Sequence, residues 1–448
     1  MNKDLLLIEI NECDFKYFQY GSKKYNYSFI KNFFLNKKKI YTSTPDRKEG
    51  FNLDPWVQWV SVHTGRLSKD HKIYRLGQKL DKSKPQIWEK LSKKKISSTI
   101  WGAFNATLRI KKNIDLFFPD PWSFKEEAFP TNYNTYLKLP RYYAQNYPDN
   151  NKIKTLYFGI IFLKNIIFSK CFFYFLYNFF NFLKIFFISG LKSFNLYFFL
   201  DLVSLLILQN NLNKKKSDFT IIALNSFAHY QHNFWNEKKY EKIYFWYLNE
   251  MIKIINDISK NYKSSIIFNG FSQKKIKNEY HLRSRMPKIF FDKLNLDYLS
   301  IEPNMTTGAI VYFKSFEEKL KAIKKLKSLK INSYSLFDVQ DFNKKKKIFY
   351  KFSIVSLKSE YSPKSLNKNL YKRFFKKPLH VTKKVKFNNK NNKLIDSILK
   401  ETIFIRSTSR HISRGELYYK NFNFSNKYLK RNKVPNIKIF NNILNHFR

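Results

Sequence analysis

Short apolar runs that alternate with helical patterns constrain the fold of this chain more than any other feature. Leu5–Ile10 and Phe219–Leu224 have the length of strands, and the amphipathic stretch 238–258 follows the second run. Apolar runs of roughly four to eight residues are typical of buried strands, whereas longer stretches with a period of about 3.6 are typical of helices. The alternation predicts an α/β fold with a mostly parallel central sheet and helices on both faces.

The same alternation continues along the rest of the chain. We expect further strands at 97–104, 265–268, 308–313, 334–339 and 348–355, and further helices at 86–93 and 317–330. The segment 151–214 differs because aromatic and aliphatic residues crowd it, most densely at 171–183. The expected organisation is therefore an α/β core at 1–150 and 215–448 with an aromatic-rich helical insert at 151–214.

Charged residues divide this insert into short apolar pieces. A membrane-spanning helix needs about 18–20 nearly uncharged residues, and Lys164, Lys170, Lys184, Lys192 and Asp201 interrupt the run. The insert can be a cap that packs on the core, which we favour, or helices that lie in a membrane interface with lysines at its surface. A true span is the least favoured of the three.

The chain is strongly basic, with 84 Lys and Arg against 33 Asp and Glu and a net charge of +51. Such a charge suits an anionic membrane surface or nucleic acid. The charge can also reflect a bias of composition without a function, because Lys, Asn, Ile, Phe and Tyr are all abundant together, and we favour this interpretation. No nucleic-acid-binding motif is visible, so nucleic acid is not an expected partner. The first residues do not form a secretory signal. We expect a cytoplasmic protein, with peripheral membrane contact as an option.

The stretch 53–66, LDPWVQWVSVHTGR, reads as a helix with clear ends. Pro55 suits the first turn because its φ is fixed and it lacks a donor, and Gly65 suits the end. The N-terminus of such a helix favours a bound anion. Two cysteines, Cys13 and Cys171, are too few for a disulfide framework or a cysteine zinc cluster, although one bridge stays open.

At this point the chain resembles the alkaline-phosphatase-like superfamily, which includes sulfatases and type I phosphodiesterases. That family has a first strand that ends in a metal-binding Asp, a nucleophile-bearing helix that runs into Thr-Gly-Arg, and later Asp-x-x-Gly-His, Asp-His-Gly and His motifs. The matching segments are 5–11, 59–66, 71–73, 225–229, 268–270 and the region of His411. The resemblance covers most of the chain outside 150–215 and implies two metal sites that act on a phosphate or sulfate ester.

The metal positions that the resemblance implies are only partly retained. One site would comprise Asn225, His229 and His411, and His232 lies three residues beyond His229. Imidazoles suit Zn²⁺, and an open zinc site needs three protein ligands. The resemblance therefore implies a divalent metal, for which a single Zn²⁺ is the best candidate.

The second site of the family is degenerate here. Asn11 and Asn269 stand at Asp positions, and Pro55 stands at the nucleophile position. An amide is a weaker ligand for a hard cation than a carboxylate, and Pro cannot form a covalent intermediate. We expect a polar pocket of Asn11, Asn269 and Glu12 at the carboxyl ends of the strands, where open α/β sheets bind ligands. Asp54 is either a general base for a water or the N-cap of the Pro55 helix.

Three functions follow from these observations. The favoured one is a hydrolase or transferase for phosphate or sulfate esters, such as those of a glycan or a lipid-linked substrate, with an altered or reduced metal site. The second is a non-catalytic descendant of that fold that binds a ligand or a partner. The third is a basic membrane-surface protein.

Overall fold

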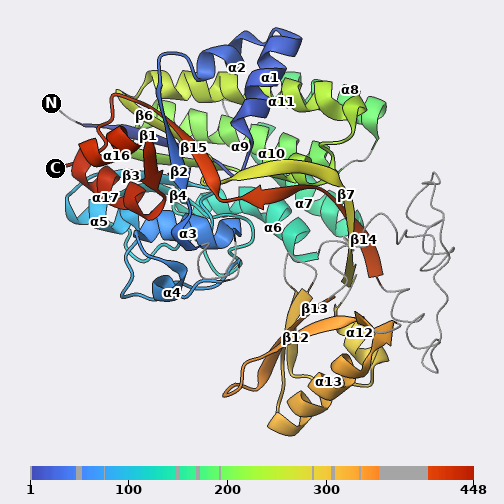
Figure 1. The fold of residues 1–448 in the computed structure, drawn as a ribbon. Coiled ribbons are helices and arrows are strands. Elements are labelled where there is room, and N and C mark those ends of the chain that lie inside the picture. The colour runs from blue at the N-terminus through green and yellow to red at the C-terminus, as the bar shows by residue number, and fades with distance from the viewer. Residues whose placement is uncertain are drawn as a thin grey trace. The chain divides into compact units, whose positions relative to one another are not determined.

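The computed structural model describes residues 3–46, 53–74, 76–146, 152–167, 172–190, 193–284, 287–303, 308–331, 334–352 and 402–448. The chain divides into two compact units, Met1–Lys275 with Ser409–Arg448 and, separately, Ile276–Thr408 (Figure 1). Cys171, Lys170, Lys192 and residues 353–355 of one predicted strand lie outside the described residues.

The first unit is built on an eight-stranded sheet in the order β16-β2-β15-β6-β1-β5-β3-β4. Neighbours from β6 to β4 are parallel, β15 is antiparallel to both of its neighbours, and β16 is parallel to β2. The mostly parallel sheet predicted from the alternation is therefore confirmed. The strands are β1 (Leu5–Ile10), β2 (Lys38–Ser43), β3 (Ser98–Trp101), β4 (Ile114–Phe118), β5 (Phe219–Leu224), β6 (Ser264–Phe268), β15 (Arg414–Lys420) and β16 (Lys433–Pro435).

Helices cover both faces of this sheet, as the sequence predicts (Figure 1). Successive side chains of a strand point to opposite faces, so Leu5 and Leu7 of β1 join one core and Leu6, Ile8 and Ile10 join the other. The first core includes residues of α3 (Pro55–Thr64), α5 (Ile87–Lys93) and α17 (Ile437–His446). The second includes residues of α1 (Phe15–Tyr25), α9 (Ser193–Lys214), α10 (Ser226–Asn233) and α11 (Lys238–Lys260).

The aromatic-rich segment forms α7 (Lys152–Ile167), α8 (Phe172–Ser189) and α9, next to α6 (Asn134–Asn146). Its helices differ in burial. Phe194, Phe198 and Leu202 of α9 are fully buried in the core that α10 and α11 share, so α9 belongs to the layer that covers the sheet. In α8, Phe173 and Phe187 are more than four-fifths exposed, at 83% and 81%. Among the described helices, α8 is long and apolar enough to cross a membrane, which for one helix is weak evidence.

The second unit has a core of its own. A four-stranded antiparallel sheet in the order β12-β13-β9-β8 packs with α12 (Pro287–Lys293) and α13 (Phe316–Ser328) around Phe290, Val311 and Tyr350. The strands are β8 (Ser300–Pro303), β9 (Gly308–Tyr312), β12 (Phe337–Asp341) and β13 (Lys347–Phe352). The sequence did not predict this unit as separate from the core, although strands that overlap β9, β12 and β13, and the helix α13, were predicted.

The remaining elements are short or connect the others. The long strands β7 (Ser272–Ser284) and β14 (Thr402–Ile412) pair as a two-stranded sheet, and β10 (Lys330–Ile331) pairs with β11 (Tyr334–Ser335). The short helices are α2 (Ser28–Phe33), α4 (Ser68–His71) and α16 (Asn426–Arg431).

Two buried polar contacts fix α3 on the central strand. All ten side chains of α3 are buried. Trp59 Nε1 donates to Asn11 Oδ1 at 2.7 Å, and one turn further on His63 Nε2 lies 2.7 Å from Glu9 Oε1. The two donors lie four residues apart on the helix and the two acceptors lie two apart on the strand extension, so the contacts set the register of α3 on β1.

The Glu9–His63 pair gives a test of this attachment. His63→Ala leaves the carboxylate of Glu9 buried without its partner, which costs about 3–5 kcal/mol when a buried pair is broken. Urea titration should show that loss in the free energy of unfolding. The double variant Glu9→Leu/His63→Leu is the control and should recover most of the loss, since it removes both polar groups. A loss of well under ~1 kcal/mol in His63→Ala would contradict the role of the pair.

Candidate metal site

Three asparagines end three neighbouring parallel strands. Asn11 follows β1, Asn225 follows β5 and Asn269 follows β6. Ile10 pairs with Leu224, and Glu9 pairs with Phe268, so the three strands end at nearly the same level. This edge is the one at which open α/β sheets bind ligands.

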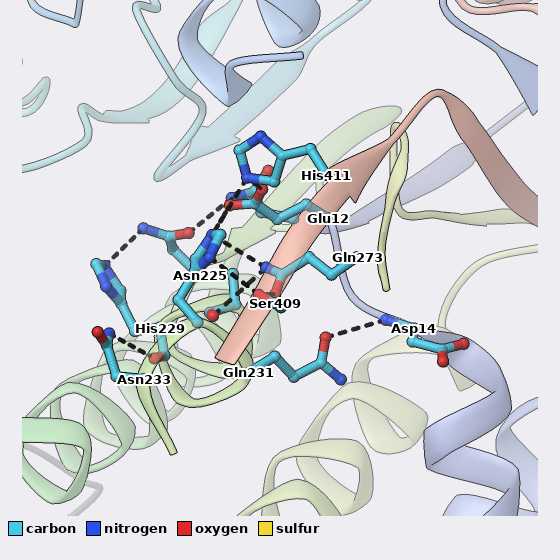
Figure 2. Close-up of polar contacts among 12 residues, drawn as sticks. Glu12, Asp14, Asn225, His229, Gln231, Asn233, Gln273, Ser409 and His411 are labelled. Carbon is cyan, nitrogen blue, oxygen red and sulfur yellow. Dashed lines mark hydrogen bonds and ion pairs between the residues drawn. The ribbon is translucent and has the colours of Figure 1, made fainter. Parts of the chain in front are cut away.

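Asn11 connects two of these positions through its side chain. Its Nδ2 donates to Asn225 Oδ1 at 2.7 Å and to Glu12 Oε1 at 3.0 Å. Asn225 Nδ2 in turn donates to His229 Nε2 at 3.1 Å. The structure thus brings Asn11, Glu12, Asn225 and His229 into one hydrogen-bonded chain (Figure 2).

Asn269 has a different place. Its Nδ2 donates to the carbonyl of Cys13 at 2.8 Å, and its Oδ1 accepts from the backbone N–H of Glu416 at 2.8 Å. Its own carbonyl accepts from the N–H of Glu12 at 2.9 Å. The side chain is therefore occupied by backbone groups, and Asn269 holds the turn after β1 on β6 and β15.

Glu12, His232 and His411 form a cluster whose ligand atoms all lie within 4.8 Å of one another. His232 Nε2 lies 3.2 Å from both Glu12 Oε1 and His411 Nε2. His411 Nε2 also forms an ion pair with Glu12 Oε2. All three residues were predicted from the sequence as site residues, but Glu12 was assigned to the degenerate pocket, apart from the two histidines.

The donor set fits a small divalent cation. Ligands about 2.0–2.1 Å from a tetrahedral Zn²⁺ lie roughly 3.3 Å from one another, close to the 3.2 Å that separates His232 Nε2 from its two neighbours. The carboxylate of Glu12 is 4% exposed, whereas His232 and His411 are 28% and 23% exposed. The side of the cluster formed by the carboxylate is therefore closed to solvent, whereas the side formed by the imidazoles is open to it.

Ser409 and Gln273 orient His232 for such a role (Figure 2). Ser409 Oγ donates to Gln273 Oε1 at 2.5 Å and lies 3.1 Å from His232 Nδ1. Because the hydroxyl has a single proton, it accepts from His232 Nδ1–H, and the lone pair of Nε2 then points at the cluster. Gln273 Nε2 lies 3.1 Å from the same Nε2 and donates to it in the absence of a cation, so a bound cation would replace this contact. Such outer contacts commonly fix the tautomer of a metal-binding histidine.

Neither Ser409 nor Gln273 was predicted from the sequence. A signal for Ser409 was present, since it lies two residues before His411 and a strand places such residues on the same face. Gln273 lies in β7, which pairs with β14. The sequence contains no motif that predicts this pairing.

The electrostatics of the cluster favour a positive charge beside Glu12. Burial raises the pKa of this carboxyl group, but the imidazoles of His411 and His232 outweigh burial and hold the pKa well below its usual range. Burial likewise lowers the pKa of His411, but Glu12, with a smaller contribution from Asp54, raises it above its usual range. Glu12 also has a φ of 45°, a left-handed conformation that is uncommon outside glycine and asparagine and is frequent at functional sites.

The residues predicted around the nucleophile position lie at the start of α3. Pro55 is the first residue of the helix and offers no nucleophile. Asp54 occupies the N-cap position, but its side chain accepts no hydrogen bond from the first turn. Its charge instead acts on His411, whose pKa it helps to raise.

His229 lies next to the cluster and outside its three ligands. Its ring stacks on Tyr197, with the centroids 4.5 Å apart and the planes at 20°. Burial, with a smaller effect of His232, lowers its pKa to about 4. His229 is therefore neutral at pH 7.

The opposite pKa shifts of Glu12 and His411 predict a pH range in which their pairing stabilises the metal-free protein most. The raised pKa of His411 stabilises the fold below 6.5, its ordinary value, and this contribution is lost as the pH rises through the folded pKa. The lowered pKa of Glu12 stabilises the fold above 4.5 and is lost as the pH falls through its folded value. The stability advantage of the wild type over Glu12→Gln should therefore be largest between these two values.

Urea titrations in the presence of a chelator, at a series of pH values, measure this difference. A control variant, Asp70→Asn, changes an exposed carboxylate elsewhere and should give a flat difference. An advantage of the wild type that does not vary with pH would contradict the pairing of Glu12 with His411.

Comparisons with known proteins give matches among solved structures alone. No protein-family model and no curated protein matches the chain. Among solved structures, phosphonoacetate hydrolase from Sinorhizobium meliloti 1021 is similar at 9% identity and a TM-score of 0.43, over 100% of this chain and 96% of that one. Murine ectonucleotide pyrophosphatase/phosphodiesterase 5 is similar at 7% identity and a TM-score of 0.44, over 99% and 95%.

At these identities and TM-scores the likeness carries no argument about this chain. The description of the chain therefore rests on the sheet and on the residues that end β1, β5 and β6. By its sheet and the helices on both faces, the chain is an α/β protein with a mostly parallel central sheet.

Proposed function

We propose that this chain hydrolyses or transfers phosphate esters with the aid of a single divalent cation held by Glu12, His232 and His411. The observation that carries the proposal is the convergence of these ligand atoms from the turn after β1, from α10 and from β14. Ser409 supports it, because its hydroxyl accepts from His232 Nδ1–H and so leaves the lone pair on Nε2, the ring atom that lies 3.2 Å from Glu12 Oε1.

The proposed metal is Zn²⁺. Two imidazoles and one carboxylate are a frequent donor set of catalytic zinc sites, which keep a fourth position open. Mg²⁺ and Ca²⁺ prefer several oxygen ligands, and the cluster offers one carboxylate. The amides at positions 11, 225 and 269 further reduce the negative charge near the site, which supports one cation in place of the two that the family resemblance implies.

When bound, such a cation polarises a phosphoryl oxygen and lowers the pKa of a water. The chain itself supplies the groups around it. Pro55 cannot act as a nucleophile, so the proposed reaction is a direct attack on phosphorus by water or by an acceptor hydroxyl, which breaks the phosphorus–oxygen bond to the leaving alcohol. Asp54, whose charge acts on His411, is the proposed acceptor of the attacking group's proton, which then passes to the leaving alkoxide. The amide of Asn225 and the neutral ring of His229 are the proposed contacts of the ester oxygens.

Metal analysis of purified protein tests the ligand set. We expect about one equivalent of Zn²⁺ per chain in the wild type and a loss of most of it in Glu12→Ala and His411→Ala. His229→Ala is the matched control, since it removes a neighbouring imidazole from outside the cluster and should keep the metal. Metal lost in His229→Ala but kept in Glu12→Ala would instead assign the metal to Asn225, His229 and His411.

The same preparation separates the alternatives. Zinc-dependent hydrolysis of 4-nitrophenyl phosphate supports the proposed enzyme, and faster hydrolysis of 4-nitrophenyl sulfate would assign the site to sulfate esters. A metal content near zero, unchanged in all variants, would favour a non-catalytic descendant that binds a ligand or partner.

We further propose that the protein attaches peripherally to an anionic membrane through α7 and α8. Exposed side chains recur at helical spacing and form one apolar stripe on each helix, which is typical of helices that lie in a membrane interface. The residues are Ile153, Leu156, Tyr157, Ile160 and Ile167 of α7 and Phe173, Tyr177, Phe180, Phe187 and Ile188 of α8. The net charge of +51 supports attraction to an anionic lipid surface.

Flotation with vesicles of anionic phospholipid tests this attachment. The double variant Phe173→Asp/Phe187→Asp should reduce the bound fraction about tenfold or more, since each change places a charge in the apolar stripe. Leu320→Asp, at an exposed position of α13, is the control and should bind as the wild type does. Equal flotation of all three proteins would contradict a role for α8.

A further inference from the structure

A cavity of about 150 Å³ lies directly beside the candidate metal site. Its walls come from the ends of β3 and β4, from the loop after β4 and from α6, α7 and α9. The lining is mostly aromatic and includes Trp101, Phe118, Trp122, Tyr136, Phe162 and Tyr197. Asn225 and His229 line the same cavity, so it shares two residues with the polar edge of the sheet.

Three polar groups in the wall, those of Trp101, Ser204 and Asp201, have partners in the protein. Trp101 Nε1 donates to Ser204 Oγ at 2.6 Å, and the ring of Trp101 stacks on Phe118 with centroids 4.1 Å apart. Asp201 accepts from the backbone N–H groups of Asn225 and Ser226, at 3.2 and 2.9 Å, at the start of α10. These contacts leave aromatic faces as the main surface that the cavity offers to a ligand.

Asn225 connects the cavity to the metal cluster. Its Oδ1 accepts from Asn11 Nδ2, which also donates to Glu12 Oε1. His229, which bonds to Asn225, has its ring covered by Tyr197 of the cavity wall. An ester placed at Glu12, His232 and His411 would therefore have its organic group next to the cavity.

We propose that this cavity binds the apolar group attached to the ester oxygen of the substrate, a group the size of one six-membered ring. The proposal rests on the proposed function and names its substrate class. An apolar cavity of roughly 150 Å³ holds a benzene-sized molecule. A sugar or glycerol group would lose hydrogen bonds to water and find few replacements among aromatic faces.

The origin of the walls adds a second argument. Phe162 belongs to α7 and Tyr197 to α9, and both lie in the segment that the family resemblance does not cover. The segment that the family resemblance does not cover thus forms part of the cavity wall, which is where a substrate preference different from that of the family would arise.

Binding of phenol to the wild type tests the cavity without any need for metal or turnover. Trp101 and Trp122 line the cavity, so quenching of tryptophan fluorescence is the readout, with calorimetry as a second one. Ala144→Phe fills the cavity from α6 and should weaken phenol binding at least tenfold. Leu320→Phe adds the same ring at an exposed position of α13 and should bind phenol as the wild type does.

Kinetics on the zinc-loaded protein test the substrate class. The kcat/KM for phenyl phosphate or for 3-methylbut-2-enyl phosphate should exceed that for glycerol 3-phosphate at least tenfold, and the better of the two identifies an aryl or a prenyl group. In Ala144→Phe this preference should disappear while turnover of glycerol 3-phosphate persists. Should Ala144→Phe fold poorly by circular dichroism, Leu200→Phe fills the cavity from α9.

The outcomes separate the two proposals. Phenol binding that Ala144→Phe and Leu200→Phe abolish, without turnover of any ester, supports the cavity and overturns the proposed function. Absence of phenol binding to the wild type, binding unaffected by both filling variants, or equal kcat/KM for the phenyl and glycerol esters overturns the cavity proposal.

Discussion

The carboxylate of Glu12, held between two imidazoles at the end of the central strand, is the interaction on which the site depends. A buried carboxylate is costly unless a positive charge compensates it. Here two flanking histidines supply that compensation when protonated, and a divalent cation would supply it when they are neutral. The backbone at Glu12 is also held in place, because the carbonyl of Asn269, the residue after β6, accepts from the N–H of Glu12, and Glu12 adopts a left-handed φ. The left-handed conformation has an energetic cost. It places the carboxylate in contact with His232 and His411.

Much of the frame could be predicted from the sequence. Leu5–Ile10 and Phe219–Leu224 are strands with the predicted bounds, because runs that are buried on both faces leave a strong apolar signal. The three asparagines end neighbouring strands because parallel strands bring their carboxyl ends to one edge of the sheet. His411 and His232 were named because the family resemblance and helical spacing both pointed to them.

The finer arrangement could not be predicted. His229 and His232 lie three residues apart on α10, and only the rotation of that helix decides that His232 meets Glu12 while His229 meets Asn225. The turn after β1 decides that Glu12 joins them, and no spacing rule describes it. The second unit was missed because its strands look like those of the first and no linker composition precedes Ile276. A single role for the aromatic-rich segment could not be predicted either, because its helices differ: α9 is part of the core, whereas α8 is largely exposed.

The helix α10 carries one histidine toward the aromatic cavity and another toward the metal cluster, within a single turn. A ligand that binds at one site and shifts this helix would therefore change the affinity of the other site for its own ligand. Thermodynamic linkage makes such an effect reciprocal, so the factor by which the cation tightens an apolar ligand equals the factor by which that ligand tightens the cation. The selectivity of the cavity and the affinity for the metal would then be coupled. The strength of this coupling would depend on the rigidity of the eight-residue helix α10.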